Sequence, residues 1–191
     1  MIRFASLAAV AGLLAAPALA APEAYTIDTA HTTIVAKYDH LGYAPGFAMF
    51  SGVTGEIAFD PADAAASSVT ISFPVASIQT GAAERTTHFL TPDFFGADEN
   101  PNATFASTAI EVTGDKTAKV TGDLTINGIT KPAVLDVTMN ATGEHPMIKK
   151  PWAGFTATTT LLRSEFDMGM FTPFVSDAVT VEIGVEAMKA E

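Results

Sequence analysis

The chain has 191 residues, of which ten are basic and 21 acidic, so its net charge is −11. A surface this acidic repels phosphate groups, which makes nucleic acid and anionic membrane surfaces poor candidates for partners. The chain contains no cysteine, and this excludes disulfides, thiolate nucleophiles and zinc sites of the cysteine type. Burial of an apolar core must therefore stabilise the fold by itself.

The first twenty residues have the pattern of a secretory signal peptide. Arg3 precedes an apolar run rich in alanine and leucine, and small residues end the run at 18–20. We predict cleavage near Ala20, which leaves residues 21–191 as a single exported domain without stable membrane insertion. Pro17 interrupts the short run, and this disfavours the alternative of a membrane anchor.

Alternation of apolar and polar residues indicates eight or nine antiparallel strands in the mature chain. The clearest case is 178–187, where Val179, Val181 and Ile183 alternate with polar residues or glycine. A period of two is the pattern of a strand with one buried face. The predicted strands are, in chain order, 24–28, 33–38, 50–59, 68–76, 104–112, 118–126, 132–141, 154–163 and 178–187.

One short helix and one irregular apolar segment interrupt the predicted strands. The helix is expected over 82–90, and residues 94–103 after it are expected to form a loop. Residues 164–177 carry several phenylalanines and methionines but no strand alternation. We expect this segment to cover one end of the molecule, either by ordinary loop packing or as the cap of a ligand opening.

Eight antiparallel strands favour a closed barrel, because closure removes the sheet edges that two packed sheets would leave. A barrel of this size either fills its interior with side chains or holds one small ligand. Thirteen phenylalanines and seven methionines, against three tyrosines and one tryptophan, form a soft apolar set that suits the wall of a cavity. The filled and the hollow barrel both stay open at this point.

A series of short motifs follows in order along the mature chain. The motifs are Tyr25-x-x-Asp28-x-x-His31-Thr32, Phe50-x-x-Val53-x-Gly55, Arg85-x-x-His88-Phe89-Leu90, Asp93-Phe94-Phe95, Gly122-x-Leu124-Thr125-Ile126-x-Gly128, Arg163-Ser164-x-Phe166 and Val175-Ser176-Asp177. Taken together, these motifs resemble the YceI-like family. The chain departs from the family pattern at Thr86, where an aspartate is usual, and over residues 42–49.

This resemblance implies an all-β fold, a lipocalin-like eight-stranded antiparallel β-barrel with one short helix in the middle of the chain. It also implies a periplasmic binding or carrier protein that holds a polyisoprenoid, such as a quinone tail, inside the barrel. Neither catalytic residues nor a required cofactor come with it, and a homodimer is left open. The acidic surface favours a neutral, quinone-like head group over a free diphosphate.

Candidate site residues fall into an apolar set and a polar set. The polar set, for a ligand head group or for structural hydrogen bonds, is His31, Arg85, His88 and Arg163. The four histidines lack the spacing of a metal site, so no metal is expected. The apolar set, predicted to line the ligand site, is Phe50, Phe73, Phe89, Phe94, Phe105, Phe155, Leu161, Phe166, Met168, Met170, Phe171 and Phe174.

Arg163 is in phase with Phe155 and Leu161, so its guanidinium is expected on the apolar face of its strand. An unpaired charge there is costly. We therefore expect Arg163 to pair with a carboxylate such as Asp28 or Asp177, or to meet an oxygen of the ligand.

Three alternatives to a lipid carrier follow from the same sequence. The first alternative is a small outer-membrane barrel, because alternation does not reveal whether the apolar face of the strands points into the barrel or outward to lipid. The few tyrosines and the single tryptophan, however, cannot form two aromatic girdles. A hydrolase that pairs His31 or His88 with a serine is the second, but the chain has no Gly-x-Ser-x-Gly motif. The third is a filled-core β-domain that acts as an adaptor for a protein partner and carries no lipid.

Overall fold

The structure is a computed structural model that describes residues 21–191, so the predicted signal peptide over 1–20 lies outside the described residues. One α-helix, α1 (Ala83–Leu90), and three short 3-10 helices, Ala64–Ala66, Val75–Ser77 and Arg163–Phe166, accompany the strands. The strands are β1 (Glu23–Ile27), β2 (Thr33–His40), β3 (Ala44–Phe50), β4 (Thr54–Phe59), β5 (Ser68–Pro74), β6 (Asn102–Gly114), β7 (Thr117–Ile126), β8 (Ile129–Glu144), β9 (Pro151–Leu162) and β10 (Val175–Lys189).

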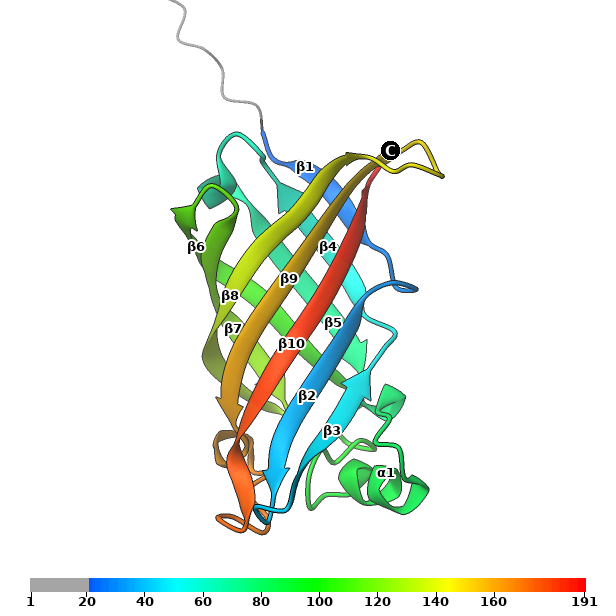
Figure 1. Cartoon of the computed structure of the whole chain (residues 1–191), viewed down its shortest axis with the longest axis vertical. Helices are drawn as coiled ribbons and strands as arrows, with labels where there is room; N and C mark the ends of the chain where they lie inside the picture. The colour runs from blue at the N-terminus through cyan, green and yellow to red at the C-terminus, as the bar shows by residue number, and fades with distance from the viewer. Residues whose placement is uncertain (1–20) are drawn as a thin grey trace, which may run out of the picture.

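The ten strands occupy eight positions around a closed antiparallel barrel (Figure 1). β1 and β2 both pair with β10, with Tyr25 opposite Lys189 and Ala36 opposite Val181, so they follow one another along the same side of β10. β4 pairs with β1, and β3 pairs with β2, in the same manner. β1 and β2 together therefore fill one position, β3 and β4 together fill the next, and β5 to β10 fill one position each. The predicted eight-stranded antiparallel barrel is confirmed.

The prediction of one strand over 50–59 is wrong, because the chain breaks between β3 and β4. Gly52 has a φ of +70° there, a backbone conformation that glycine adopts without steric cost. The buried positions move from Ala48 and Phe50 in β3 to Ile57 and Phe59 in β4. The inward-facing residues thus change from even to odd numbers, and the break restores the orientation of the chain toward the barrel interior.

Several other boundaries differ from the prediction by a few residues. β6 begins at Asn102, inside the expected loop, and α1 begins at Ala83 instead of Ala82. β10 begins at Val175, inside the segment expected to be irregular. Within residues 21–191, no helix combines the length and the apolar composition that crossing a bilayer requires.

The inward faces of the strands form the core of the barrel. In β10, Val181 and Ile183 are buried while Thr180 and Glu182 are exposed. The register between β9 and β10 continues without a shift from Leu162 opposite Ala178 to Trp152 opposite Met188. Because side chains alternate between the two faces of each strand, this register directs one continuous apolar surface into the barrel.

The barrel wall is completed differently at its two ends. At the end that holds the C-terminus, β1 closes the wall by pairing with both β4 and β10 (Figure 1). At the opposite end, Met49 of β3 exchanges backbone hydrogen bonds of 2.9 and 2.8 Å with Gln79, and the chain then turns into α1. Phe89 and Leu90 of α1 pack against the core, so the helix completes the wall there.

Candidate ligand-binding site

A cavity of about 420 Å³ lies inside the barrel at the end that carries α1. Its wall combines inward-facing side chains of the strands with residues of α1 and of the 163–175 segment. The polar side chains on the wall include Glu84, Arg85, His88 and Arg163. The barrel is therefore hollow at this end, and its wall includes Phe50, Phe73, Phe89, Phe94, Phe105, Leu161, Phe166, Met168 and Phe171.

Phenylalanines from separate parts of the chain form one side of this cavity. Phe50 of β3 lies 5.2 Å, centroid to centroid, from Phe73 of β5 and 5.6 Å from Phe95 after the helix. Phe89 of α1 lies 5.0 Å from Phe94. Tilted and edge-on aromatic pairs at these distances attract one another, so they fix α1 and the following turn against the sheet.

Tyr38 joins the sheet to the helix at the same end. It is opposite Gly46 in the β2–β3 pair, and a Cβ at Gly46 would lie only 2.2 Å from the Tyr38 ring. Glycine is required there because the ring covers the neighbouring backbone. The ring lies 6.2 Å from Phe89, so Tyr38 lines the cavity as part of the aromatic wall.

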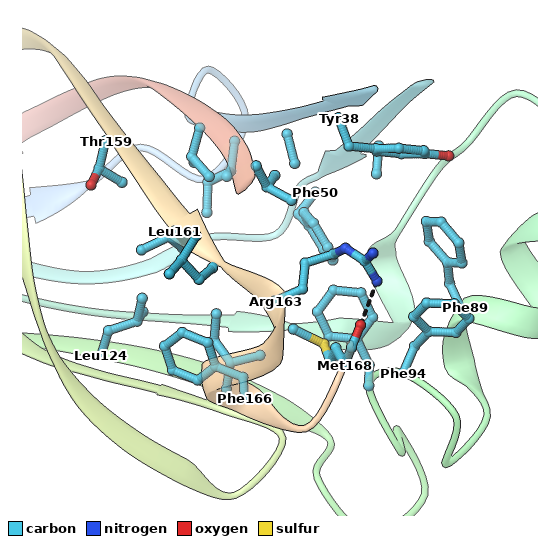
Figure 2. A pocket seen from close by; sticks show the side chains of 18 of the residues that line it. Tyr38, Phe50, Phe89, Phe94, Leu124, Thr159, Leu161, Arg163, Phe166 and Met168 are labelled. Atoms are coloured by element: carbon cyan, nitrogen blue, oxygen red, sulfur yellow. Dashed lines mark hydrogen bonds between the residues drawn. The ribbon is translucent and has the colours of Figure 1, made fainter. Parts of the chain in front are cut away.

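Arg163 extends from the end of β9 into the cavity, toward Phe50, Phe89 and Phe94 (Figure 2). Its Nε donates to the carbonyl of Ser176 at 2.9 Å, and its Nη2 donates to the carbonyl of Val175 at 3.1 Å. Its Nη1 donates to the carbonyls of Met168 and Met170. Burial lowers the pKa of the guanidinium, and these carbonyls hold it in place as a charged donor.

The expected ion pair between Arg163 and Asp28 or Asp177 is wrong, because backbone carbonyls take the place of a carboxylate. Asp177 accepts hydrogen bonds instead from the backbone N–H of Ser164, at 2.7 Å, and from the Ser164 hydroxyl, at 2.6 Å. These bonds lower the pKa of the Asp177 carboxyl. Asp177 therefore caps the turn that carries Arg163, and the two residues fix the 163–177 segment together.

Arg85 and His88 stand on the cavity side of α1. Arg85 Nη2 donates to the backbone carbonyl of Thr80, and its remaining N–H groups are donors within reach of the opening. His88 Nε2 lies 3.2 Å from a carboxylate oxygen of Asp93, and its ring packs edge-on against Phe94 at 5.0 Å. A bound molecule would meet these two side chains at the cavity mouth and apolar walls further inside.

A second cavity of about 180 Å³ lies toward the other end of the barrel. It lies beside the β4–β5 connection and the β6–β7 turn, and Phe155 is on its wall. Four side chains belong to the walls of both cavities, namely Ile71, Phe105, Leu135 and Ile183. We call these four residues the waist, since they border both of the apolar spaces along the barrel.

The YceI-like domain family matches residues 25–187, which include every residue that lines the two cavities. The chain belongs to the YceI-like family. It is 39% identical over 193 residues to a UPF0312 protein of Pseudomonas putida, with 97% of this chain and 96% of the relative covered. It is 35% identical over 195 residues to a UPF0312 protein of Ectopseudomonas mendocina, with 99% and 100% covered.

Solved structures of other proteins share the fold of this chain. BcnA of Burkholderia cenocepacia has a TM-score of 0.76 at 28% identity, covering 84% of this chain and 98% of that one. A YceI protein of Campylobacter jejuni has a TM-score of 0.70 at 31% identity, covering 75% and 85%. A polyisoprenoid-binding domain of Saccharophagus degradans has a TM-score of 0.65 at 15% identity, covering 88% and 99%, and this likeness concerns the fold.

The structure brings most of the predicted site residues of this YceI-like chain to one cavity. Nine of the apolar set line the larger cavity, as named above, together with Arg85, His88 and Arg163. Phe155 lines the smaller cavity instead. Met170 and Phe174 are exposed on the 167–174 segment and lie outside both walls, and His31 lies on the outer surface.

Some residues of this YceI-like cavity were not among the sequence candidates. Tyr38 was not selected because the apolar alternation of its strand, β2, is short. Phe95 is the second residue of the Phe94–Phe95 pair and could have been taken with it. The waist residue Leu135 belongs to the alternating pattern of β8, but a strand pattern gives only the face and not the distance to the opposite wall.

His31 forms a small polar cluster outside the barrel with Asp28 and Glu186. Metal-ligating atoms of these three residues lie within 4.8 Å of one another, a closeness that the sequence spacing did not predict. His31 Nδ1 lies 2.6 Å from Asp28 Oδ2, and Trp152 Nε1 donates to Glu186 at 2.9 Å. The groups therefore already satisfy one another, and they hold the β1–β2 turn against β10.

The His31–Asp28 pair makes stability depend weakly on pH. The hydrogen bond with Asp28 raises the pKa of His31 above its usual 6.5, and the same bond lowers the pKa of Asp28 below 3.8. The contribution of His31 is complete below pH 6.5 and is lost as pH rises through its raised pKa, while that of Asp28 is complete above pH 3.8 and is lost as pH falls through its lowered pKa. The pair is thus most stabilising between these two pH values.

We expect the melting temperature of the wild type to fall by about 1–2 °C more than that of a His31→Gln variant when the pH rises from 5.5 to 8.5. The effect is small because the imidazole is exposed. Thermal unfolding followed by circular dichroism in one buffer series measures it. Parallel curves for the two proteins would contradict the assignment of this pH dependence to His31.

Proposed function

We propose that this protein is an exported, periplasmic carrier that buries the chain of a long polyisoprenoid lipid, such as an isoprenoid quinone, and performs no chemical step on it. The observation that carries the proposal is the apolar cavity of about 420 Å³ inside the barrel. A filled core, as an adaptor protein would have, leaves no such space.

The walls favour a chain over a compact polar ligand. Each methylene group moved from water into an apolar site contributes roughly 0.8 kcal/mol, so a long chain offsets the entropy of association without many polar contacts. The smaller cavity beyond the waist extends the apolar space along the barrel axis. A linear chain that starts in the larger cavity would reach it by displacing waist side chains such as Leu135 and Ile183.

The mouth of the larger cavity fits a neutral head group. Arg163 has its donors directed at four backbone carbonyls, so it is a poor partner for a diphosphate. Glu84 also lies on the wall and would repel one. Arg85 and His88 offer hydrogen-bond donors for a ketone oxygen, which is the kind of acceptor a quinone presents.

One structural neighbour supports the same ligand class. The Saccharophagus degradans domain of this fold is described as polyisoprenoid-binding. Its likeness supplies the fold, and the cavity in this chain supplies the space for such a ligand. The two together favour an isoprenoid over other apolar molecules.

Native mass spectrometry of the protein expressed with its N-terminal segment and recovered from the periplasm tests this proposal. We expect one lipid per chain, which organic extraction and fragmentation identify as an isoprenoid with a neutral head group. A lipid with a diphosphate head group would contradict the head-group assignment. A protein without bound lipid that also rejects added isoprenoid quinones would overturn the proposal and favour the adaptor role.

A further inference from the structure

Exposed aromatic side chains gather at the end of the barrel where the larger cavity opens. Tyr43 in the β2–β3 turn is 89% exposed and Phe174 is 72% exposed. Every aromatic ring among the exposed large hydrophobic residues of 21–191 lies in β3, in this turn or in the 167–174 segment. Two exposed aliphatic side chains, Leu41 and Met170, lie in the same segments. We call these aromatic and aliphatic residues together the mouth ring, which consists of Leu41, Tyr43, Phe47, Met170, Phe171 and Phe174.

The mouth ring stands on backbone that is held in place. Leu41 N donates to the carbonyl of Phe174 at 3.0 Å, which ties the β2–β3 turn to the 167–174 segment, and both lie at the same end of the molecule (Figure 1). Val175 N donates to the carbonyl of Phe171 at 2.9 Å, and Arg163 holds the carbonyl of Met170. The side chains of the mouth ring are thus exposed to solvent on a backbone that hydrogen bonds hold in place.

The mouth ring is continuous with the cavity wall. Phe171 is 55% exposed and also lines the larger cavity, and its ring lies 6.3 Å from that of His88 on α1. Leu41 directly follows His40, another residue of the wall, and Tyr43 lies two residues further on. Phe171 therefore connects the apolar surface on the outside of the barrel with the wall of the cavity.

A lipid bilayer is the occupant that these features fit. Clustered exposed apolar side chains mark a surface that is covered during function, and aromatic rings bind well at the boundary between head groups and hydrocarbon. The surplus of acidic over basic residues, 21 against ten, disfavours an anionic surface. Contact with a zwitterionic bilayer would also give an apolar ligand a path into the cavity that avoids water.

We propose that the mouth ring docks this protein reversibly on zwitterionic lipid bilayers, with the opening of the larger cavity facing the membrane. The purpose of docking, which is the transfer of a lipid, rests on the proposed function. The docking itself depends only on the exposed side chains. Insertion is shallow, because only side chains of turns and of one strand edge project from this end.

Sedimentation with phosphatidylcholine vesicles tests the docking. We expect the wild-type protein to bind, and a Tyr43→Ser/Phe174→Ser variant to bind about tenfold less, since two exposed rings are lost. The matched control is Met147→Ser/Ile148→Ser, which removes two exposed apolar side chains from the β8–β9 hairpin at the opposite end. This control should bind like the wild type, and admixture of phosphatidylglycerol should not strengthen binding.

A fluorescent variant gives an independent measurement of orientation. The chain has a single tryptophan, Trp152, at the far end of β9 from the mouth ring. We expect brominated phosphatidylcholine to quench an added tryptophan in Phe174→Trp and to leave Trp152 of the wild type unquenched. This substitution keeps the apolar character of the ring, so its reading does not depend on the folding of the serine variant.

Several outcomes would overturn the docking proposal. They are a wild type that stays in the supernatant, a control variant that loses as much binding as the ring variant, and binding that requires phosphatidylglycerol. A wild-type dimer that dissociates in the ring variant, without vesicle binding, would assign the mouth ring to a second copy of the chain. Lipid extraction from the same samples separates the two proposals, because a protein that carries isoprenoid but ignores vesicles contradicts docking alone.

Discussion

Replacement of Arg163 by methionine will lower the free energy of unfolding by about 2–4 kcal/mol. The guanidinium donates to the carbonyls of Met168, Met170, Val175 and Ser176, and methionine leaves these acceptors without a donor. A partly buried acceptor without a partner costs about 1–3 kcal/mol, and water replaces part of the loss because the site lies near the opening. Urea denaturation followed by circular dichroism measures the change.

A surface cation provides the control for this variant. Lys119 Nζ lies 2.6 Å from Asp136 Oδ1, and both side chains are exposed, so Lys119→Met should leave the midpoint of urea denaturation nearly unchanged. Unchanged stability together with lost isoprenoid binding in Arg163→Met would contradict this prediction and make the guanidinium a ligand contact. Lost stability with binding retained at low temperature would show that the guanidinium stabilises the 163–177 segment.

The behaviour of Arg163 shows where sequence reasoning reaches its limit. Its phase with Phe155 and Leu161 correctly placed the guanidinium on the inner face. Its partners were not predictable, because the carbonyls of 168–176 reach it only when a 3-10 helix at Arg163–Phe166 turns the chain back. A sequence reveals side-chain chemistry and periodicity, but it does not reveal which backbone groups a loop will present.

The barrel itself was predictable because most of its long strands obey the same period. The alternation along β10 determines which residues face inward, and the number of strands favours closure. The sequence also contained a signal for the break between β3 and β4, because the apolar positions change from even-numbered Phe50 to odd-numbered Ile57. The two cavities were not, since their volumes depend on how closely side chains from opposite walls approach one another.

The second cavity leads to a prediction about chain length. Leu135 lies at the waist between the cavities, with Ile71, Phe105 and Ile183, and tryptophan at this position would fill the passage. We expect Leu135→Trp to shift the bound lipid toward shorter chains and to weaken binding of a long-chain isoprenoid by about tenfold or more. Two methylenes forced out of an apolar site account for a loss of this size, at roughly 0.8 kcal/mol each.

The matched control is Val134→Trp, because Val134 is the neighbouring residue of β8 and is exposed on the outer face of the barrel. Both variants add the same side chain, so only the one that narrows the waist should change the lipid extracted from the protein. Overpacking at Leu135 costs about 1–3 kcal/mol of stability, which urea denaturation separates from the effect on binding. An unchanged chain-length distribution in Leu135→Trp would place the whole ligand on one side of the waist, with its length set by the larger cavity alone.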